Sequence, residues 1–202
     1  LKEYYGIVND SVLSGPEQVV NIKKSSKRVI SFNGFWQKKS FVDEYFDNIK
    51  KIILDNKAIK ASNTTKKEGS TMVHVRRTDY KNNKEILKSN YYKNSLEHCK
   101  KNIKNFNYSI FTDDYDWVKS QKIFKDAVNI NVPKNQLNYR NEVLSTFGKM
   151  LSFENYVIAN STFSWWAARI SSTENSKVLY PNPFFKDQSF DAFYGNWTPI
   201  ER

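Results

Sequence analysis

The sequence predicts an α/β fold built on a parallel sheet with helices on both faces, and two observations predict it. After residue 70, short apolar segments typical of strands alternate with longer segments whose apolar residues recur at helical spacing. Strands separated by helical segments are joined by crossovers, which is the connection that parallel strands require. The 202 residues also suffice for a substantial core, because folding at this size buries about 70% of the extended chain's surface.

The individual elements follow from these patterns in chain order. Residues 29–35 alternate and predict a strand and a turn, and residues 41–54 predict an amphipathic helix. The polar stretch 57–69 is typical of a connector. Beyond it, the expected strands are 71–76, 107–112, 127–132, 156–159 and 177–180, and the expected helices are 90–104, 114–124, 144–153 and 163–170. The change of pattern at the connector predicts two domains, residues 1–60 and 61–202.

Composition excludes several classes of protein. The formal net charge of +11 first suggests nucleic-acid binding, but the basic residues are spread evenly along the chain instead of forming the cluster that phosphate backbones require. The single Cys99 and two histidines exclude an internal disulfide and a zinc finger. No apolar run reaches the roughly 18 to 20 residues of a membrane helix. We therefore expect a cytoplasmic protein.

Polar and charged side chains follow three of the expected strands. Arg76 and Arg77 follow the first, Asp113 and Asp114 the second, and residues 161–164 follow the fourth with hydroxyls at the start of a helix. Ligands of open parallel sheets bind at the carboxyl ends of the strands. Guanidinium groups and a helix start suit phosphates, and a carboxylate suits a ribose or the N–H edge of guanine. The combination predicts a site for a nucleoside diphosphate.

Each of these features also has a purely structural interpretation. The arginine pair could form ion pairs with Asp79, and Asp113-Asp114 could cap a helix. Trp165-Trp166 could be core, and His74, between two valines, could be a buried histidine. Neither a Gly-x-x-x-x-Gly-Lys-Ser/Thr loop nor a Gly-x-Gly-x-x-Gly sequence occurs, which excludes a P-loop NTPase and a typical NAD enzyme. The common position of the segments at strand ends favours the functional interpretation.

Four motifs in a fixed order resemble those of a known family. They are residues 74–80 (HVRRTDY), 91–93 (YYK), 110–117 (IFTDDYDW) and 159–168 (ANSTFSWWAA). Together they resemble the bacterial α-1,2-fucosyltransferases over nearly all of residues 28–202. The His-x-Arg-Arg-x-Asp element is shared with α-1,6-fucosyltransferases.

The resemblance implies a glycosyltransferase of the GT-B type, in which two Rossmann-like domains face each other. It implies inverting transfer of L-fucose from GDP-fucose to a glycan hydroxyl, the 2-OH of a galactoside, in bacterial polysaccharide biosynthesis. The expected partners are GDP-fucose and a glycan acceptor, with no nucleic acid, no metal and no further cofactor. The expected location is the cytoplasm. Peripheral association with the inner face of the membrane is the alternative. Residues 1–60 would be a remnant of the acceptor-side domain, and 61–202 the GDP-sugar domain.

The resemblance also implies roles for individual residues at the first two strand ends. Arg76 would contact the β-phosphate, where a fixed guanidinium stabilises the departing GDP. Asp79 would orient the arginines or shape the sugar site. His74 and one of Asp113 or Asp114 would contact the guanosine.

The remaining implied substrate-binding residues are Arg77 in the arginine pair and four positions at the start of the last expected helix. These four are Asn160, Ser161, Thr162 and Ser164. Thr162 and Ser164 would contact the diphosphate through their hydroxyls and the helix N-terminus.

A catalytic base is the least defined part of the expected site. Related α-1,6 enzymes place a glutamate a few residues after the motif's aspartate, and Glu85 is the nearest such residue here, at a spacing that differs by one residue. The alternative interpretation is an exposed glutamate on a loop. An inverting displacement needs a group that accepts the hydroxyl proton, so Glu85 joins Arg76 and Asp79 as a candidate catalytic residue.

The sequence departs from the family pattern at two points. It contains no Gly-Gly-x-Gly-Asn-Gln loop near its start, so we expect much of the acceptor-side domain to be absent from the chain. Thr78 stands where the α-1,2 enzymes usually carry glycine, which brings the motif closer to the α-1,6 pattern. A non-catalytic GDP-sugar-binding or glycan-binding fragment is therefore the alternative function, and a nucleic-acid-binding protein is the less favoured one.

Overall fold

A computed structural model describes residues 5–9, 29–33, 38–81, 84–133, 139–187 and 190–202. Its contacts divide the chain into two units: Leu1–Lys51 with Phe190–Phe193, and Ile52–Ser189 with Tyr194–Arg202. The larger unit contains all three segments in which the site is expected. The assignment of residues 1–60 to an acceptor-side domain stays a prediction.

The larger unit is built on a six-stranded sheet whose neighbouring strands all run parallel. In chain order the strands are β3 (Ser70–Val75), β4 (Asn107–Thr112), β5 (Asn129–Asn131), β6 (Asn155–Val157), β7 (Val178–Asn182) and β8 (Trp197–Glu201). Their spatial order is β5-β4-β3-β6-β7-β8, so the chain starts in the middle, builds one half, and returns to build the other. This is the doubly wound order, in which ligands bind where the winding reverses, here between β3 and β6. The α/β parallel-sheet prediction is confirmed.

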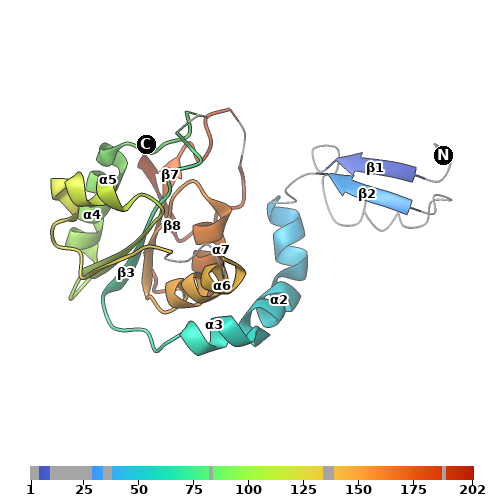
Figure 1. Cartoon of the computed structure of the whole chain (residues 1–202), viewed down its shortest axis with the longest axis horizontal. Coiled ribbons are helices and arrows are strands. Elements are labelled where there is room, and N and C mark those ends of the chain that lie inside the picture. Colours follow the sequence, from blue (N-terminus) through green and yellow to red (C-terminus); the bar gives the residue numbers. More distant parts are fainter. Residues whose placement is uncertain (1–4, 10–28, 34–37, 82–83, 134–138, 188–189) are drawn as a thin grey trace. The chain divides into compact units, whose positions relative to one another are not determined.

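Helices cover both faces of this sheet, as predicted (Figure 1). They are α4 (Ser89–Asn102), α5 (Tyr115–Ser120), the short 3-10 helix η2 (Lys122–Phe124), α6 (Tyr139–Met150) and α7 (Thr162–Ser171). Figure 1 shows α4 and α5 on one face and α6 and α7 on the other. In the ranges that the structure describes, no helix combines the length and the apolar character needed to cross a membrane.

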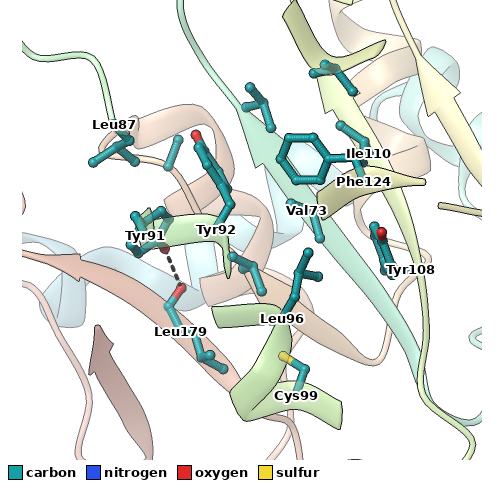
Figure 2. Packing of buried hydrophobic residues seen from close by; sticks show 14 residues of the cluster. Val73, Leu87, Tyr91, Tyr92, Leu96, Cys99, Tyr108, Ile110, Phe124 and Leu179 are labelled. Atoms are coloured by element: carbon teal, nitrogen blue, oxygen red, sulfur yellow. Dashed lines mark hydrogen bonds between the residues drawn. The ribbon is translucent and has the colours of Figure 1, made fainter. Parts of the chain in front are cut away.

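The core under α4 explains why these segments fold as they do. Tyr91, Tyr92, Leu96 and Cys99 recur at helical spacing and are all buried. Figure 2 shows them beside the strand residues that they cover. The cluster comprises Val73, Val75, Leu87, Tyr91, Tyr92, Leu96, Cys99, Tyr108, Ile110, Val118, Phe124, Val157, Ala159 and Leu179. It joins β3, β4, β6 and β7 to α4, α5 and η2.

Tyr91 fixes α4 to the strands on the far side of β3. Its hydroxyl donates a hydrogen bond to the backbone carbonyl of Ile158 over 2.6 Å and lies 3.5 Å from that of Leu179, the contact drawn in Figure 2. Burial raises the pKa of this hydroxyl well above its usual value, so it remains a donor. Ile158 lies two residues before Asn160, so this bond helps to place the start of the loop that follows β6.

The predicted connector 57–69 is wrong in its first half, because residues Lys57–Ser62 form the helix α3. The side chain of Asn56 accepts from the N–H groups of Ala58 and Ile59 and so caps the helix. Ile59 is buried, and Gly148 on α6 lets the backbone of α3 come close. A single large apolar residue in six gives no periodic signal, so the helix depends on this tertiary contact.

Two further differences concern prolines near the sheet's edge. β7 continues through Pro181 to Asn182, although residues 177–180 were the expected strand. It pairs with β6 only at Val178 and Leu179, so the N–H group that Pro181 lacks is not needed there. The edge strand β8 was not predicted, because its Pro199 argues against a strand, yet edge strands tolerate proline.

The smaller unit contains a parallel pair of strands. β1 (Tyr5–Asn9) pairs with β2 (Val29–Asn33), which confirms the expected strand after residue 28, whereas the expected turn at 34–35 lies outside the described residues. The helix predicted at 41–54 is α2 (Lys39–Asp55), which buries Phe41 and Val42. The backbone N–H of Lys39 donates to Asp191, which connects the segment 190–193 to this unit.

Candidate functional site

The loops that follow β3 and β6 meet at the point where the winding of the sheet reverses. β3 and β6 are neighbours in the sheet, so their carboxyl ends lie side by side. The hydroxyl of Tyr80, in the first loop, donates to the backbone carbonyl of Asn160, in the second, over 2.8 Å. The structure therefore brings together the arginine motif and the segment 160–164, as the sequence predicts.

Asp113 holds the arginine loop in shape from the end of β4. Its carboxylate accepts from the backbone N–H of Arg77 over 2.9 Å, and from the backbone N–H and the hydroxyl of Thr78 over 3.2 Å and 2.5 Å. It also lies 3.2 Å from Nη1 of Arg76. This carboxylate fixes the backbone of the loop and one of its cations together.

Arg76 is held by two carboxylates and remains partly open to solvent. Its Nη2 donates to Asp79 over 2.8 Å, while Nη1 faces Asp113. About a third of the side chain, 35%, is exposed. A guanidinium group held in this way is oriented before a ligand arrives, and it keeps a face that a phosphate can approach. The contact with Asp79 agrees with an orienting role for that residue.

Arg77 is placed differently from its neighbour. Its guanidinium lies 3.8 Å from the ring centroid of Trp117, and its Nε donates to Asp114 over 3.3 Å. Only 13% of each of the two charged side chains is exposed. Arg77 therefore packs against the α5 segment.

Asp114 begins α5 and also neutralises two cations. It accepts from the backbone N–H of Trp117, which is the N-cap bond of the helix, and it faces Arg77 and Lys81. Burial opposes its charged form, but hydrogen bonds from Trp117, Lys81 and Arg77 outweigh burial and lower its pKa. The capping role foreseen as an alternative is therefore present.

His74 is buried on the opposite face of β3 from the core shown in Figure 2. Its ring lies 6.2 Å from that of Phe163 on α7, and its exposed fraction is 6%. Burial, with a smaller contribution from Arg76, lowers its pKa to about 4 against the weaker opposing effect of Asp113 and Asp79. The imidazole is therefore neutral at pH 7. Its Nδ1 is buried and has no hydrogen-bond partner among the described residues.

The start of α7 has the features of an anion site. Ser161 is the N-cap residue, but no side-chain cap bond forms there. The first N–H groups of a helix have no partner within the helix, so they carry partial positive charge. Ser164 is buried and its hydroxyl donates to the carbonyl of Ser161, whereas Ser161 and Thr162 are half-buried. Donors at this helix start thus lie beside the loop that carries Arg76.

Glu85 is half-buried, with 15% of its side chain exposed, which differs from the exposed loop glutamate considered as an alternative. Its carboxylate accepts from the backbone N–H of Lys186, from Nη1 of Arg202 and from Nδ2 of Asn160, over 3.0, 2.8 and 3.1 Å. Burial opposes the charged form, but these hydrogen bonds outweigh it and lower the pKa of Glu85. A base role for Glu85 stays a prediction, and a carboxylate with a lowered pKa accepts a proton less readily.

Sequence reasoning gave no role to two residues that shape this site, Tyr80 and Arg202. Tyr80 lies in the motif, but its contact with Asn160 depends on which strands are neighbours. Arg202 lies 117 positions from Glu85 and follows a strand that was not predicted. No local pattern in the sequence connects these residues.

Metal-binding side chains are not grouped in the part of the chain that the structure describes. No three residues of the types His, Cys, Asp and Glu come together there in a way that could hold a metal ion. Metal independence of the reaction stays a prediction.

Comparison with known proteins adds evidence independent of this geometry. The chain is 29% identical over 196 residues to an alpha-1,2-colitosyltransferase of Escherichia coli, which covers 90% of this chain and 66% of that protein. It is 28% identical over 123 residues to the O-antigen biosynthesis glycosyltransferase WbnK of Escherichia coli, covering 57% of this chain and 39% of that protein. The chain thus spans less than two thirds of the length of either relative. No solved structure matches it.

The matched region contains nearly all of the site described above, up to the residue before Arg202. Residues 16–201 match glycosyl transferase family 11, and this range includes all four motifs from residue 74 to residue 168. The resemblance to the α-1,2-fucosyltransferase family is confirmed by this match and by the colitosyltransferase relative. The chain belongs to glycosyl transferase family 11.

Proposed function

We propose that the larger unit binds GDP-fucose and serves inverting transfer of L-fucose to a glycan hydroxyl. The observation that carries this proposal is the bond from Tyr80 to the carbonyl of Asn160. It joins the loop of Arg76 to the start of α7 at the reversal point of the sheet. A guanidinium and a helix N-terminus side by side match the two phosphates of a nucleoside diphosphate.

In this proposal the diphosphate lies between Arg76 and the first turn of α7. Arg76 contacts the β-phosphate, and the N–H groups and hydroxyls of Ser161 and Thr162 contact the diphosphate from the other side. Asp79 keeps the guanidinium of Arg76 oriented, as its 2.8 Å contact indicates. When the ligand binds, the phosphates take over some of the contacts that Arg76 otherwise makes with Asp79 and Asp113.

The guanosine lies towards His74 and the end of β4 in this proposal. The neutral ring of His74 has a buried nitrogen without a partner among the described residues, which supports a ligand contact there. One of Asp113 and Asp114 accepts from N–H groups of the guanosine in addition to its contacts within the protein.

The reaction itself is a single displacement at the anomeric carbon of fucose. The acceptor oxygen, the 2-OH of a galactoside, forms a bond to C1 while the bond from C1 to the β-phosphate oxygen breaks, and its electron pair stays on GDP. The hydroxyl proton passes to a base. Arg76 and the start of α7 stabilise the negative charge that grows on the phosphate, which is the contribution these groups can make to the rate.

A donor-transfer assay tests the proposal. The chain is incubated with a β-galactoside and with GDP-fucose, GDP-colitose, GDP-mannose or UDP-galactose, and products are identified by mass spectrometry. We expect fucosylated product, with colitose tested because one relative is named for it. Transfer from UDP-galactose and none from a GDP-sugar would contradict the proposal.

A second candidate function follows from the chain's coverage of its relatives. It spans 66% of the colitosyltransferase, so a GDP-sugar-binding part without transfer activity is the alternative. Measuring GDP-fucose binding by calorimetry in parallel separates the two functions. Binding without transfer or hydrolysis supports this second candidate, and transfer supports the first.

A further inference from the structure

Glu85 and Arg202 form a partly buried ion pair to which four strand ends contribute. Glu85 lies in the loop after β3, Asn160 after β6, Phe184 and Lys186 after β7, and Arg202 directly after β8. The side chains of Arg202 and Glu85 are 8% and 15% exposed. All four ends lie at the carboxyl edge of the sheet, which is the edge of the proposed donor site.

Both terminal nitrogens of the Arg202 guanidinium donate hydrogen bonds to Glu85. Nη1 donates to the carboxylate of Glu85 over 2.8 Å, and Nη2 donates to the backbone carbonyl of Glu85 over 2.9 Å. Nη1 also lies 3.4 Å from the carbonyl of Phe184. Two parallel contacts to one residue fix Glu85 in backbone and side chain, which a lysine could not do from one point.

Glu85 in turn fixes the side-chain amide of Asn160. Nδ2 of Asn160 donates to the carbonyl of Glu85 over 2.8 Å and to its carboxylate over 3.1 Å. Rotating the amide by 180° would place its oxygen against these two acceptors, so only one orientation is compatible. Asn160 is fully buried and directly precedes Ser161, the N-cap of α7.

The same asparagine is held from its other side by the loop of Arg76. The carbonyl of Asn160 accepts from Tyr80, which lies four residues after Arg76. The main chain of Asn160 is therefore bound to Tyr80 and its side chain to Glu85. The position of the α7 start relative to Arg76 depends on these contacts.

We propose that Glu85 and Arg202 are positioning residues, which hold Asn160 and the start of α7 at the right place for the donor's diphosphate. The proposal rests on the proposed function and gives Glu85 a role other than that of the base. A carboxylate that accepts from three donors at 2.8 to 3.1 Å is occupied by the protein. Its effect on the reaction then passes through Asn160 and not through the acceptor's proton.

The test is a double-mutant cycle with Glu85→Gln and Arg202→Met, read as GDP affinity by calorimetry. We expect each single variant to weaken GDP binding roughly tenfold, and the double variant to be no weaker than about the worse single one, because both break one arrangement. Asp126→Asn is the matched control, since it removes the carboxylate of an exposed ion pair, 3.8 Å apart, between Lys100 on α4 and the turn after η2. Its GDP affinity should stay within about twofold of the unchanged chain.

A conservative variant of Arg202 and the pH profile of Glu85→Gln separate a positioning role from the role of a catalytic base. Arg202→Lys keeps the charge and serves if Arg202→Met does not fold; its GDP affinity should also fall. Where transfer is measurable, Glu85→Gln should raise KM for the donor and keep the shape of the pH profile of kcat. Loss of kcat with unchanged GDP affinity, or loss of the profile's acidic limb, would overturn the proposal and support a base role.

If the unchanged chain does not bind GDP, the proposed function is rejected, and NMR then tests the positioning role by itself. The readout is the backbone amide resonances of Ser161 and Thr162. Arg202→Met should shift both resonances, and Asp126→Asn should leave them unchanged. Unshifted resonances in a folded Arg202→Met variant would reject the positioning role itself.

Discussion

The guanidinium of Arg77 lies 3.8 Å from the centroid of the Trp117 ring, so this arginine is part of the packing of α5. Its neighbour Arg76 contacts Asp79 and Asp113 and exposes 35% of its side chain. Two adjacent residues of one type thus differ in environment and in expected role. Arg76 belongs to the proposed ligand site, and Arg77 belongs to the support of the loop.

Replacing Arg76 should weaken GDP binding without unfolding the protein. Arg76→Ala removes a charge-assisted contact worth roughly 1.5 to 3 kcal/mol, which corresponds to a roughly tenfold to hundredfold loss of affinity. Arg76→Lys should recover little, because one ammonium group cannot make two parallel hydrogen bonds. Calorimetry with GDP measures this, and Lys119→Ala on the exposed side of α5 controls for the loss of one positive charge. Unchanged affinity in Arg76→Ala would remove this residue from the site.

Replacing Arg77 should affect stability more than ligand binding. Arg77→Ala removes the contact with Trp117 and leaves Asp114 with less compensation, so we expect the free energy of unfolding to fall by about 1 to 3 kcal/mol. The backbone N–H that binds Asp113 remains. Urea unfolding measures the change. A variant of normal stability that has lost GDP binding would show instead that Arg77 contacts the ligand.

His74 should make the protein less stable as the pH falls from 7 to 5. Its pKa is lowered to about 4 in the folded state, whereas an unfolded histidine has a value near 6.5. Between these values the unfolded chain binds a proton that the folded chain does not, so stability falls by about 2 kcal/mol by pH 5. Glu85 and Asp114, whose pKa values are lowered, keep their contribution at pH 5 and lose it only at lower pH. Urea midpoints at pH 7 and pH 5 measure this loss of stability in the unchanged chain and in His74→Gln. The loss between the two pH values should vanish in the variant.

Two glycines give a matched test of the contact between α3 and α6. A Cβ at Gly148 would lie 2.6 Å from the backbone oxygen of Ile59, whereas a Cβ at Gly195 would meet nothing within 4 Å. Gly148→Ala should therefore destabilise the protein by about 1 to 3 kcal/mol, although alanine is the better helix former. Gly195→Ala should change the urea midpoint little. Equal midpoints for the two variants would mean that α3 does not pack closely on α6.

The parts of the fold that the sequence predicts are those with a strong local pattern. β3 and α4 lie within two residues of their expected bounds, since six consecutive buried residues and a helical repeat of buried side chains specify them. The helix α3 has one buried residue and depends on the close approach at Gly148. The strand β8 contains Pro199 and is defined by its partner β7.

As with the fold, only part of the site could be predicted from the sequence. Motif order and strand ends placed Arg76, Asp113 and Ser161 at one edge of the sheet, because parallel strands bring their carboxyl ends together. The separation of Arg76 from Arg77 was not predictable, because it depends on where α5 presents Trp117. The pairing of Glu85 with Arg202 depends on the whole sheet being assembled, since four strand ends contribute to it.

A comparison of GDP with GMP by titration calorimetry tests the central claim most directly, since the two ligands differ only in the β-phosphate assigned to Arg76. We expect GDP to bind, and GMP to bind about tenfold or more weakly, in line with the loss of one charge-assisted phosphate contact. In Arg76→Ala the preference for GDP over GMP should shrink, because only the contacts from the start of α7 remain. No binding of GDP, or equal affinities for GDP and GMP in the unchanged chain, would contradict the claim.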